Sequence, residues 1–190
     1  MRVAGKTPEP PNRRRLSVWL QERLFERRIV LVSGRLDADL AAEAAAALMA
    51  LDAIGQEPIE LHVDSADGTL ESAFVLIDTA DLLRATLRIH CFGQVGGPAI
   101  GVVAAADHRS AVPHTRFRLF QPTMQFSGPP DQIASYSRQQ QELLWRLHAR
   151  LAHLTGRPAE EIAEDMRRER YLDATEALAY GLIDEIRGTR

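Results

Sequence analysis

The stretch that decides the fold is residues 87–106, which read LRIHCFGQVGGPAIGVVAAA. Its first part, 87–92, is mostly apolar and predicts a strand. A glycine-rich turn is expected at 93–98, and the proline that ends it suits the first turn of the apolar helix predicted to continue through Ala106. A strand, a tight turn and a helix in this order form one βα unit of an α/β domain.

Two similar units come before this stretch. The first has an apolar strand predicted at 28–33 and a helix at 38–52, capped by the preceding aspartate. In the second, apolar and polar residues alternate over 59–63, which predicts a half-buried strand ending in the turn 64–68, and a helix follows at 69–85. Three such units in a row indicate stacked βα layers on a mainly parallel sheet.

The chain after Ala106 follows another pattern. A strand is predicted at 116–120 and a long helix at 131–154. At 1.5 Å per residue this helix is roughly 35 Å long, so we expect it to project and pack on another subunit. Beyond it we expect a short helix from Pro158 and an apolar link at Tyr171 and Leu172. A helix from Asp173 to Gly181, with a capping-box start at Asp173 and Glu176, is expected to follow, and then a strand at 182–186.

Composition limits the domain organisation and the partners. The chain has 190 residues, which fits one domain, predicted at 16–190. Residues 1–15 are polar and proline-rich, and we expect them to form a mobile N-terminal arm. The formal net charge is −3 and acidic and basic residues are mixed, so the sequence predicts no broad basic surface for nucleic acid.

Cysteine content and hydropathy point to the cytoplasm. Cys91 is the only cysteine, so neither a disulfide nor a cysteine metal site can form within one chain, which suits a reducing compartment. Nowhere do about 18 apolar residues follow one another, and no signal peptide or membrane span is predicted. We therefore expect a soluble, cytoplasmic protein.

Four short motifs make the sequence similar to a known family. They are CFGQ at 91–94, QP at 121–122, TG at 155–156 and YGLID at 180–184. In order and spacing they resemble the proteolytic subunit of the Clp serine proteases, over roughly 24–186. The resemblance implies a ClpP/crotonase-like α/β fold whose long helix is a projecting handle between rings, and subunits that assemble as stacked heptameric rings.

The same resemblance indicates that the catalytic triad is not intact. In the family the nucleophile is a serine four residues after the glycine of the Gly-Gln pair, and here that position is Gly97. The general base is a histidine immediately before Gln-Pro, and here it is Phe120. Asp165 matches the third position. Glycine has no side-chain oxygen and phenylalanine cannot accept a proton, so the sequence predicts no serine-peptidase chemistry.

The oxyanion hole and the substrate turn are altered as well. Pro98 stands where the family uses a backbone N–H to bind the oxyanion, and proline has no N–H. Gly68 matches the second donor, but Asp67 beside it replaces a glycine and adds negative charge. Ser65 belongs to the same turn. It does not suggest a dyad with His62, because a strand places residues three apart on opposite faces.

Two further departures concern partners and substrate. Family members carry aromatic side chains on the strand before the turn, lining clefts where an AAA+ unfoldase docks. Glu60 and His62 occupy those positions, so we expect weak docking of a Clp ATPase. Residues 123–125, Thr-Met-Gln, replace a glycine-rich substrate-pairing stretch. The other histidines (His90, His108, His114, His148 and His153) have no metal-ligand spacing, so neither a metal nor a cofactor is predicted.

The sequence leaves three functional interpretations. The favoured one is a non-catalytic subunit, structural or regulatory, in a mixed ring with a catalytic paralogue. The second is an active hydrolase or acyl-CoA enzyme with non-standard residues, using the amides of Gly68, Gly96 and Gly97 as an oxyanion cradle. Against it, no basic cluster near the turns is available for the CoA phosphates. The third is a homomeric scaffold that binds peptides without cleaving them.

Overall fold

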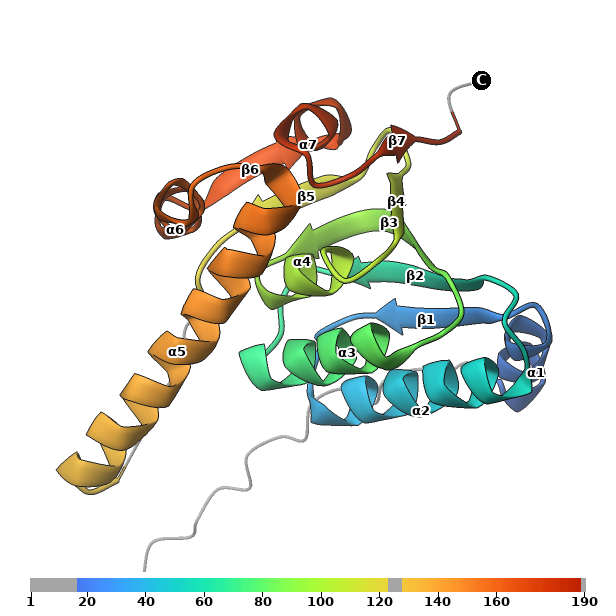
Figure 1. Cartoon of the computed structure of the whole chain (residues 1–190), viewed down its shortest axis with the longest axis horizontal. Helices are drawn as coiled ribbons and strands as arrows, with labels where there is room; N and C mark the ends of the chain where they lie inside the picture. Colours follow the sequence, from blue (N-terminus) through green and yellow to red (C-terminus); the bar gives the residue numbers. More distant parts are fainter. Residues whose placement is uncertain (1–16, 123–127, 189–190) are drawn as a thin grey trace, which may run out of the picture.

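The computed structural model describes residues 17–122 and 128–188. The expectations for the arm at 1–15 and for residues 123–125 lie outside these ranges. The described chain is a mixed α/β domain in which helices cover one face of a parallel sheet of strand order β1-β2-β3-β4-β7 (Figure 1). The predicted α/β fold with a mainly parallel sheet is confirmed.

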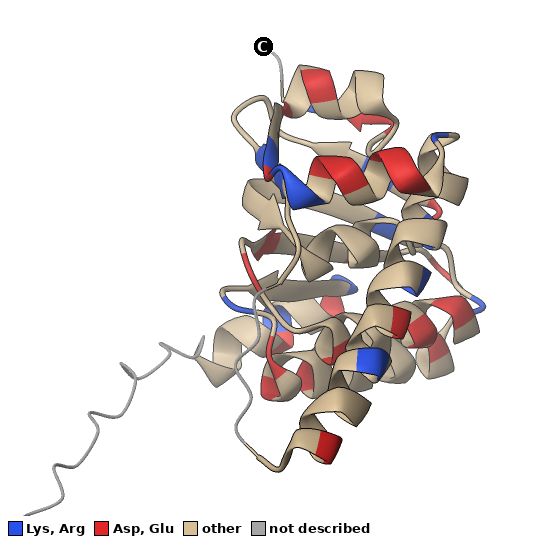
Figure 2. Cartoon of the chain, turned by 90° about the vertical axis from the view of Figure 1, so that its left-hand side faces the viewer, with Lys and Arg blue, Asp and Glu red and all other residues tan. Residues whose placement is uncertain are grey.

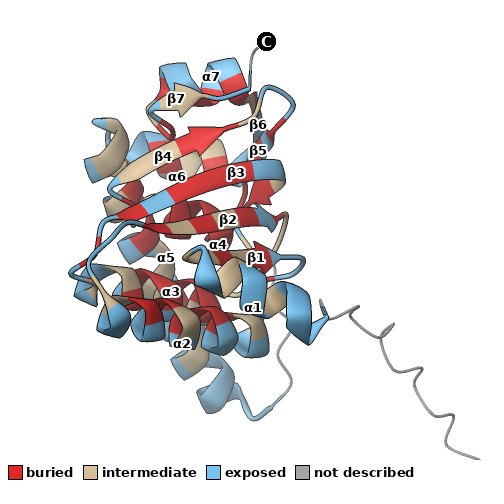
Figure 3. Cartoon of the chain, turned by 90° about the vertical axis from the view of Figure 1, so that its right-hand side faces the viewer, coloured by how far each residue is buried: buried red, intermediate tan, exposed pale blue. Residues whose placement is uncertain are grey.

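Three βα units build the first half, as predicted. Their strands and helices are β1 (Ile29–Ser33), α2 (Ala38–Ile54), β2 (Ile59–Ser65), α3 (Leu70–Leu82), β3 (Leu87–Gly96) and α4 (Pro98–Val103). An additional helix, α1 (Val18–Glu26), precedes them and packs at the β1 edge of the sheet. The central strands β2 and β3 are coloured mainly as buried in Figure 3. Along β2, buried apolar residues alternate with less buried polar ones, so the two sets face opposite sides of the sheet.

Capping residues fix where the helices begin. The Asp37 side chain accepts a hydrogen bond from the Leu40 N–H, so the predicted cap of α2 is confirmed. Thr69 caps α3 in the same way, and the helix therefore begins at Leu70. α3 ends before Ala85, because the Asp52 carboxylate binds the N–H groups of Arg84 and Ala85 in place of helix carbonyls.

The structure corrects the predicted turn at 93–98. β3 continues to Gly96, because residues 94–96 pair in parallel with β5 (Arg116–Leu119). The turn is thereby reduced to Gly97, the residue that joins β3 to α4. α4 is also shorter than predicted and ends at Val103. The Ala104 N–H still bonds four residues back to Ile100, but those of Ala105 and Ala106 bond three residues back in tight turns.

The C-terminal part contains strands that the sequence did not indicate. Tyr171 and Leu172 lie in β6 (Arg170–Asp173), which pairs antiparallel with β5, so they are not a simple link. β4 (His108–Ala111) was not predicted. The last strand, β7, is shorter than predicted: it covers Glu185–Ile186, which pair with Ser110 and Ala111 of β4.

The remaining helices follow the prediction closely. They are α5 (Pro130–Thr155), α6 (Ala159–Arg167) and α7 (Ala174–Tyr180). The capping box of Asp173 and Glu176 and the left-handed end of α7 at Gly181 are confirmed. Acidic and basic residues are interspersed over these elements (Figure 2), in agreement with the mixed charge pattern of the sequence.

The long helix α5 extends beyond the sheet (Figure 1). Leu147 and Leu151 in its second half are buried in the core, whereas Ile133 near its start is 40% exposed. Tyr136 ties the first half to α3 by donating a hydrogen bond of 2.9 Å to Glu71. Among the described helices, none is both long and apolar enough to cross a membrane.

Candidate functional site

Gly97 forms a sharp elbow between β3 and α4. Its backbone has φ +51° and ψ −123°, in the positive-φ region that residues with a side chain rarely adopt. The N–H of Gly97 donates a hydrogen bond of 3.0 Å to the carbonyl of Arg118 in β5. Pro98 is the first helical residue of α4, so the position after the elbow has no N–H to donate.

The ring of Phe120 lies directly against this elbow. A Cβ atom built on Gly97 would be 2.8 Å from both Cε1 and Cζ of Phe120, closer than real Cβ contacts come. Phe120 is only 7% exposed, and the Arg118 guanidinium lies 4.3 Å from the centre of its ring. The structure therefore brings together the two positions matched to nucleophile and base, and an aromatic ring occupies the space that a nucleophile side chain would need.

Asp165 belongs to a polar network between α6, β6 and α7. Its Oδ2 accepts a hydrogen bond of 2.7 Å from the Tyr180 hydroxyl, and Arg170 Nη1 lies 3.0 Å from the same oxygen. Burial, reinforced by the Asp165 carboxylate, raises the pKa of Tyr180 well above its usual range. The recorded partners of Asp165 thus tie secondary-structure elements together, and no contact with Phe120 is among them.

The Gly68 N–H is already hydrogen-bonded. It donates to Oδ1 of Asp67 over 2.7 Å, and the other oxygen of Asp67 pairs with Arg35. A Cβ on Gly68 would be 2.7 Å from the carbonyl oxygen of Leu36, which explains the glycine. Neither position matched to the oxyanion hole therefore offers a free N–H donor. Pro98 has no N–H, and the N–H of Gly68 is already bonded to Asp67.

Ser65 and His62 do not meet. The Ser65 side chain is fully buried on the helix side of β2 and donates to the carbonyl of Asp67 over 3.1 Å. His62 lies on the other face of the same strand. Their separation follows from the two-residue period of a strand.

Comparison with known proteins agrees with this architecture. A family model, described as Clp protease, matches residues 12–190. The chain belongs to the Clp protease family. Among its relatives is the "ATP-dependent Clp protease proteolytic subunit 2" of Pseudomonas aeruginosa strain PAO1, which is 32% identical over 169 residues, or 88% of this chain and 84% of that protein. The family resemblance inferred from the short motifs is confirmed.

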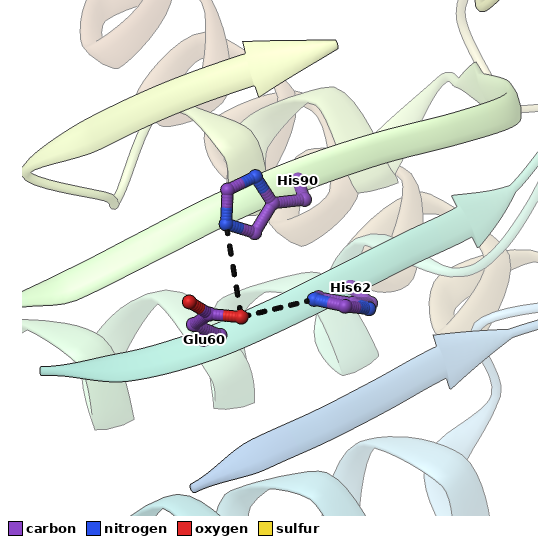
Figure 4. Close-up of side chains that lie close together, drawn as sticks. All are labelled: Glu60, His62 and His90. Atoms are coloured by element: carbon purple, nitrogen blue, oxygen red, sulfur yellow. Dashed lines mark hydrogen bonds and ion pairs between the residues drawn. The ribbon is translucent and has the colours of Figure 1, made fainter. Parts of the chain in front are cut away.

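A second polar group lies on the open face of the sheet of this Clp family member (Figure 4). It comprises Glu60, His62 and His90, which we call the outer-face cluster. Nε2 of His62 is 3.4 Å from Oε2 of Glu60, and Nε2 of His90 is 3.9 Å from the same oxygen. The three side chains offer ligand atoms that all lie within 4.8 Å of one another, an arrangement able to hold a metal ion.

Sequence reasoning missed His90 as a member of this cluster. The signal was the register: His90 is the direct partner of His62 in the parallel pairing of β2 with β3, so both rings point to the same face. Burial lowers the pKa of His90, although the nearby Glu60 carboxylate acts in the opposite direction. Spacing along one strand does not reveal a site shared between two strands.

Proposed function

We propose that this chain is a non-catalytic subunit of a Clp-type proteolytic chamber that co-assembles with a catalytic paralogue in the cytoplasm. The observation that carries the proposal is the contact of Phe120 with Gly97, which fills the elbow where the family nucleophile would stand. The domain at 16–190 then supplies a wall segment of the chamber.

Three independent losses support the absence of peptidase activity. Gly97 cannot form an acyl-enzyme, and Phe120 cannot act as a base. Loss of one oxyanion donor alone costs about 10²–10³ in rate, and here Pro98 has no N–H while that of Gly68 is bonded to Asp67. Reversal of one change would leave the other two in place.

The alternative of an acyl-CoA enzyme fits the geometry less well. Of the amides of Gly68, Gly96 and Gly97 that would form its oxyanion cradle, those of Gly97 and Gly68 already donate to the Arg118 carbonyl and to Asp67. A bound acyl group would have to replace both internal hydrogen bonds. Loss of the bond from Gly97 would deprive the Arg118 carbonyl of this donor, which costs about 1–3 kcal/mol for a buried neutral acceptor.

The surface of α5 supports a role in assembly. Trp145 is 53% exposed and Ile133 is 40% exposed, so this projecting helix offers apolar side chains to a partner. We infer that α5 contacts a second ring, as the handle helix does in the resemblance drawn from the sequence. The name of the Pseudomonas relative includes ATP dependence, so the complete complex is proposed to work with a Clp ATPase.

Glu60 and His62 disfavour direct docking of that ATPase on this chain. Both side chains are partly exposed and polar, so an apolar docking loop would have to desolvate them. We propose that the catalytic paralogue supplies the stronger docking sites in a mixed ring. Tight binding of the ATPase to a ring of this chain alone would contradict this part of the proposal.

The test is native mass spectrometry of the complex recovered from its own cells through a tag on this chain. The expected result is a mixed ring in which the other subunit carries an intact serine, histidine and aspartate. A ring of this chain alone would overturn co-assembly and favour the peptide-binding scaffold.

A parallel assay tests the absence of catalysis. The purified chain is incubated with a fluorogenic peptide, with and without a serine-directed phosphonate, next to the isolated paralogue as positive control. We expect phosphonate-sensitive hydrolysis from the paralogue only. Hydrolysis by this chain that the phosphonate blocks would contradict the non-catalytic assignment.

A further inference from the structure

The outer-face cluster has the composition of a transition-metal site. Two imidazoles and one carboxylate are the ligand set with which proteins hold Zn²⁺ when a fourth position is left open. We propose that Glu60, His62 and His90 bind one divalent transition-metal ion per chain, with Zn²⁺ as the best match. The inference concerns these side chains and does not depend on the proposed function.

The distances between the ligand atoms suit a tetrahedral ion. Bonds of about 2.0–2.1 Å at the tetrahedral angle place two ligand atoms about 3.3 Å apart. The separation of Glu60 Oε2 from His62 Nε2 is 3.4 Å, and its separation from His90 Nε2 is 3.9 Å. The ligand atoms of the two histidines lie within 4.8 Å of each other. An ion among the three atoms therefore requires the ligand atoms to move closer by rotation of side chains that already point toward one another (Figure 4).

The hydrogen bonds of Ser110 determine which nitrogen of His90 is available. The Ser110 hydroxyl lies 3.3 Å from the carbonyl oxygen of Ile89, to which it donates. Its oxygen is then the acceptor for Nδ1–H of His90, at 2.5 Å. The proton on Nδ1 leaves the lone pair on Nε2, the atom that faces Glu60. A buried partner that fixes the tautomer and orientation of the ring is a common support of metal-binding histidines.

His62 is also oriented by its surroundings. Its ring packs edge-on to that of His90 and tilted against that of Phe92, in both cases with ring centres 5.2 Å apart. The two ligand strands are neighbours in the sheet, so the site is built on rigid elements and not on a loop. Such pre-organisation reduces the entropy lost on binding an ion.

A second group of polar side chains shows why the cluster stands out. His108 lies 3.6 Å from Asp184 and 3.0 Å from Glu185, but Arg109 binds Asp184 and Arg187 binds Glu185. A cation there would have to compete with two guanidinium groups. The contacts of Glu60 with the two histidines involve no guanidinium, and an imidazole in its neutral form does not oppose a cation.

The site is accessible from solvent. The side chains of Glu60 and His62 are 38% and 25% exposed, whereas His90 is 11% exposed. The fourth coordination position therefore opens toward solvent, where a water molecule or a side chain of a partner completes the shell. A cavity of about 240 Å³ lined by His90, Phe92 and Ser110 adjoins it.

The experiment is a Zn²⁺ titration of the full-length, untagged protein after removal of metal by EDTA, followed by calorimetry and native mass spectrometry. The expected stoichiometry is one Zn²⁺ per chain. His62→Ala and His90→Ala each should weaken binding at least tenfold, and His153→Ala, which removes an exposed histidine of α5, should leave it unchanged.

Ser110→Ala provides a test that retains all three ligands. Removal of the partner of His90 is expected to lower the affinity about 10–100-fold, with the far-ultraviolet circular dichroism spectrum unchanged. Co²⁺ serves as a second probe, since its visible absorption should be present in the parent protein and lost in His90→Ala. Absence of Zn²⁺ binding, or binding unaffected in both His62→Ala and His90→Ala, would overturn the proposal.

Discussion

The elbow at Gly97 and the outer-face cluster both depend on β3, but they are built in opposite ways. At the end of the strand, the Phe120 ring closes the space over Gly97, and the neighbouring N–H groups are consumed by internal bonds. On the open face, His90 meets two polar side chains that remain partly exposed. The contrast is between an elbow closed by an aromatic ring and internal hydrogen bonds, and an open face that presents polar, ligand-type groups to solvent.

The largest expected effect tests how tightly the elbow is closed. Gly97→Ser would place a side chain 2.8 Å from the Phe120 ring and force a positive φ on serine. Crowding and backbone strain together should reduce the free energy of unfolding by about 2–5 kcal/mol. Urea denaturation of both proteins measures the difference.

Gly156→Ser is the matched control for this change. Gly156 also has a positive φ, but no atom lies within 4 Å of a Cβ built there. Only the conformational cost of about 1–2 kcal/mol should remain. In a double-mutant cycle, Phe120→Ala should recover part of the loss in Gly97→Ser. If the two serine variants were equally stable, the elbow would not be closed by contact.

A smaller effect tests whether Asp165 is a structural residue. Asp165→Asn removes the charge that holds Arg170 and weakens the bond with the Tyr180 hydroxyl, and it should cost about 1–3 kcal/mol. Glu164→Gln is the control, because the partners of Glu164 within the described residues are the exposed Arg167 and Arg168, and its loss should cost less than about 1 kcal/mol. Thermal unfolding distinguishes the two. Equal small losses would argue against a structural network.

The pH dependence of stability should come in part from His148, a histidine buried outside both sites. Burial lowers its pKa from the ordinary 6.5, and its Nε2 has no hydrogen-bond partner within the described chain. Below pH 6.5 His148 binds a proton in the unfolded chain, whereas in the folded protein it binds one only at a lower pH. The free energy of unfolding therefore falls as the pH drops, until the lowered pKa is reached.

His148→Leu should flatten this dependence. The measurement is urea denaturation of the parent and the variant from about pH 5 to pH 7, the range in which an ordinary histidine titrates. The exposed His153 serves as control, and His153→Leu should keep the slope of the parent. An unchanged slope in His148→Leu would contradict the assignment.

The smallest effect is expected in the outer-face cluster. Without metal, Glu60→Gln removes two partly exposed contacts with histidines and should alter the free energy of unfolding by less than about 1 kcal/mol. A similarly small value for Gly97→Ser would erase the contrast between the two regions. A large loss for Glu60→Gln would mean that the cluster supports the fold.

The sequence by itself determined the features that depend on neighbouring residues. The periodicity of β2, the caps at Asp37 and Asp173 and the end of α7 at Gly181 are local, because their hydrogen bonds reach only a few residues along the chain. The order of these local features was sufficient for the α/β fold, and the four short motifs were sufficient for the resemblance to the Clp family. The absence of an oxygen at Gly97 and of an N–H at Pro98 is likewise a property of residue identity alone.

Tertiary structure alone decided how distant residues combine. The extension of β3 to Gly96 depends on its pairing with β5, and the closure of the elbow depends on where β5 delivers Phe120. His90 joins Glu60 and His62 through the register of two strands separated in sequence by α3. Such contacts are set by packing of the whole sheet, whose energy is spread over many residues, and no local pattern in the chain specifies them.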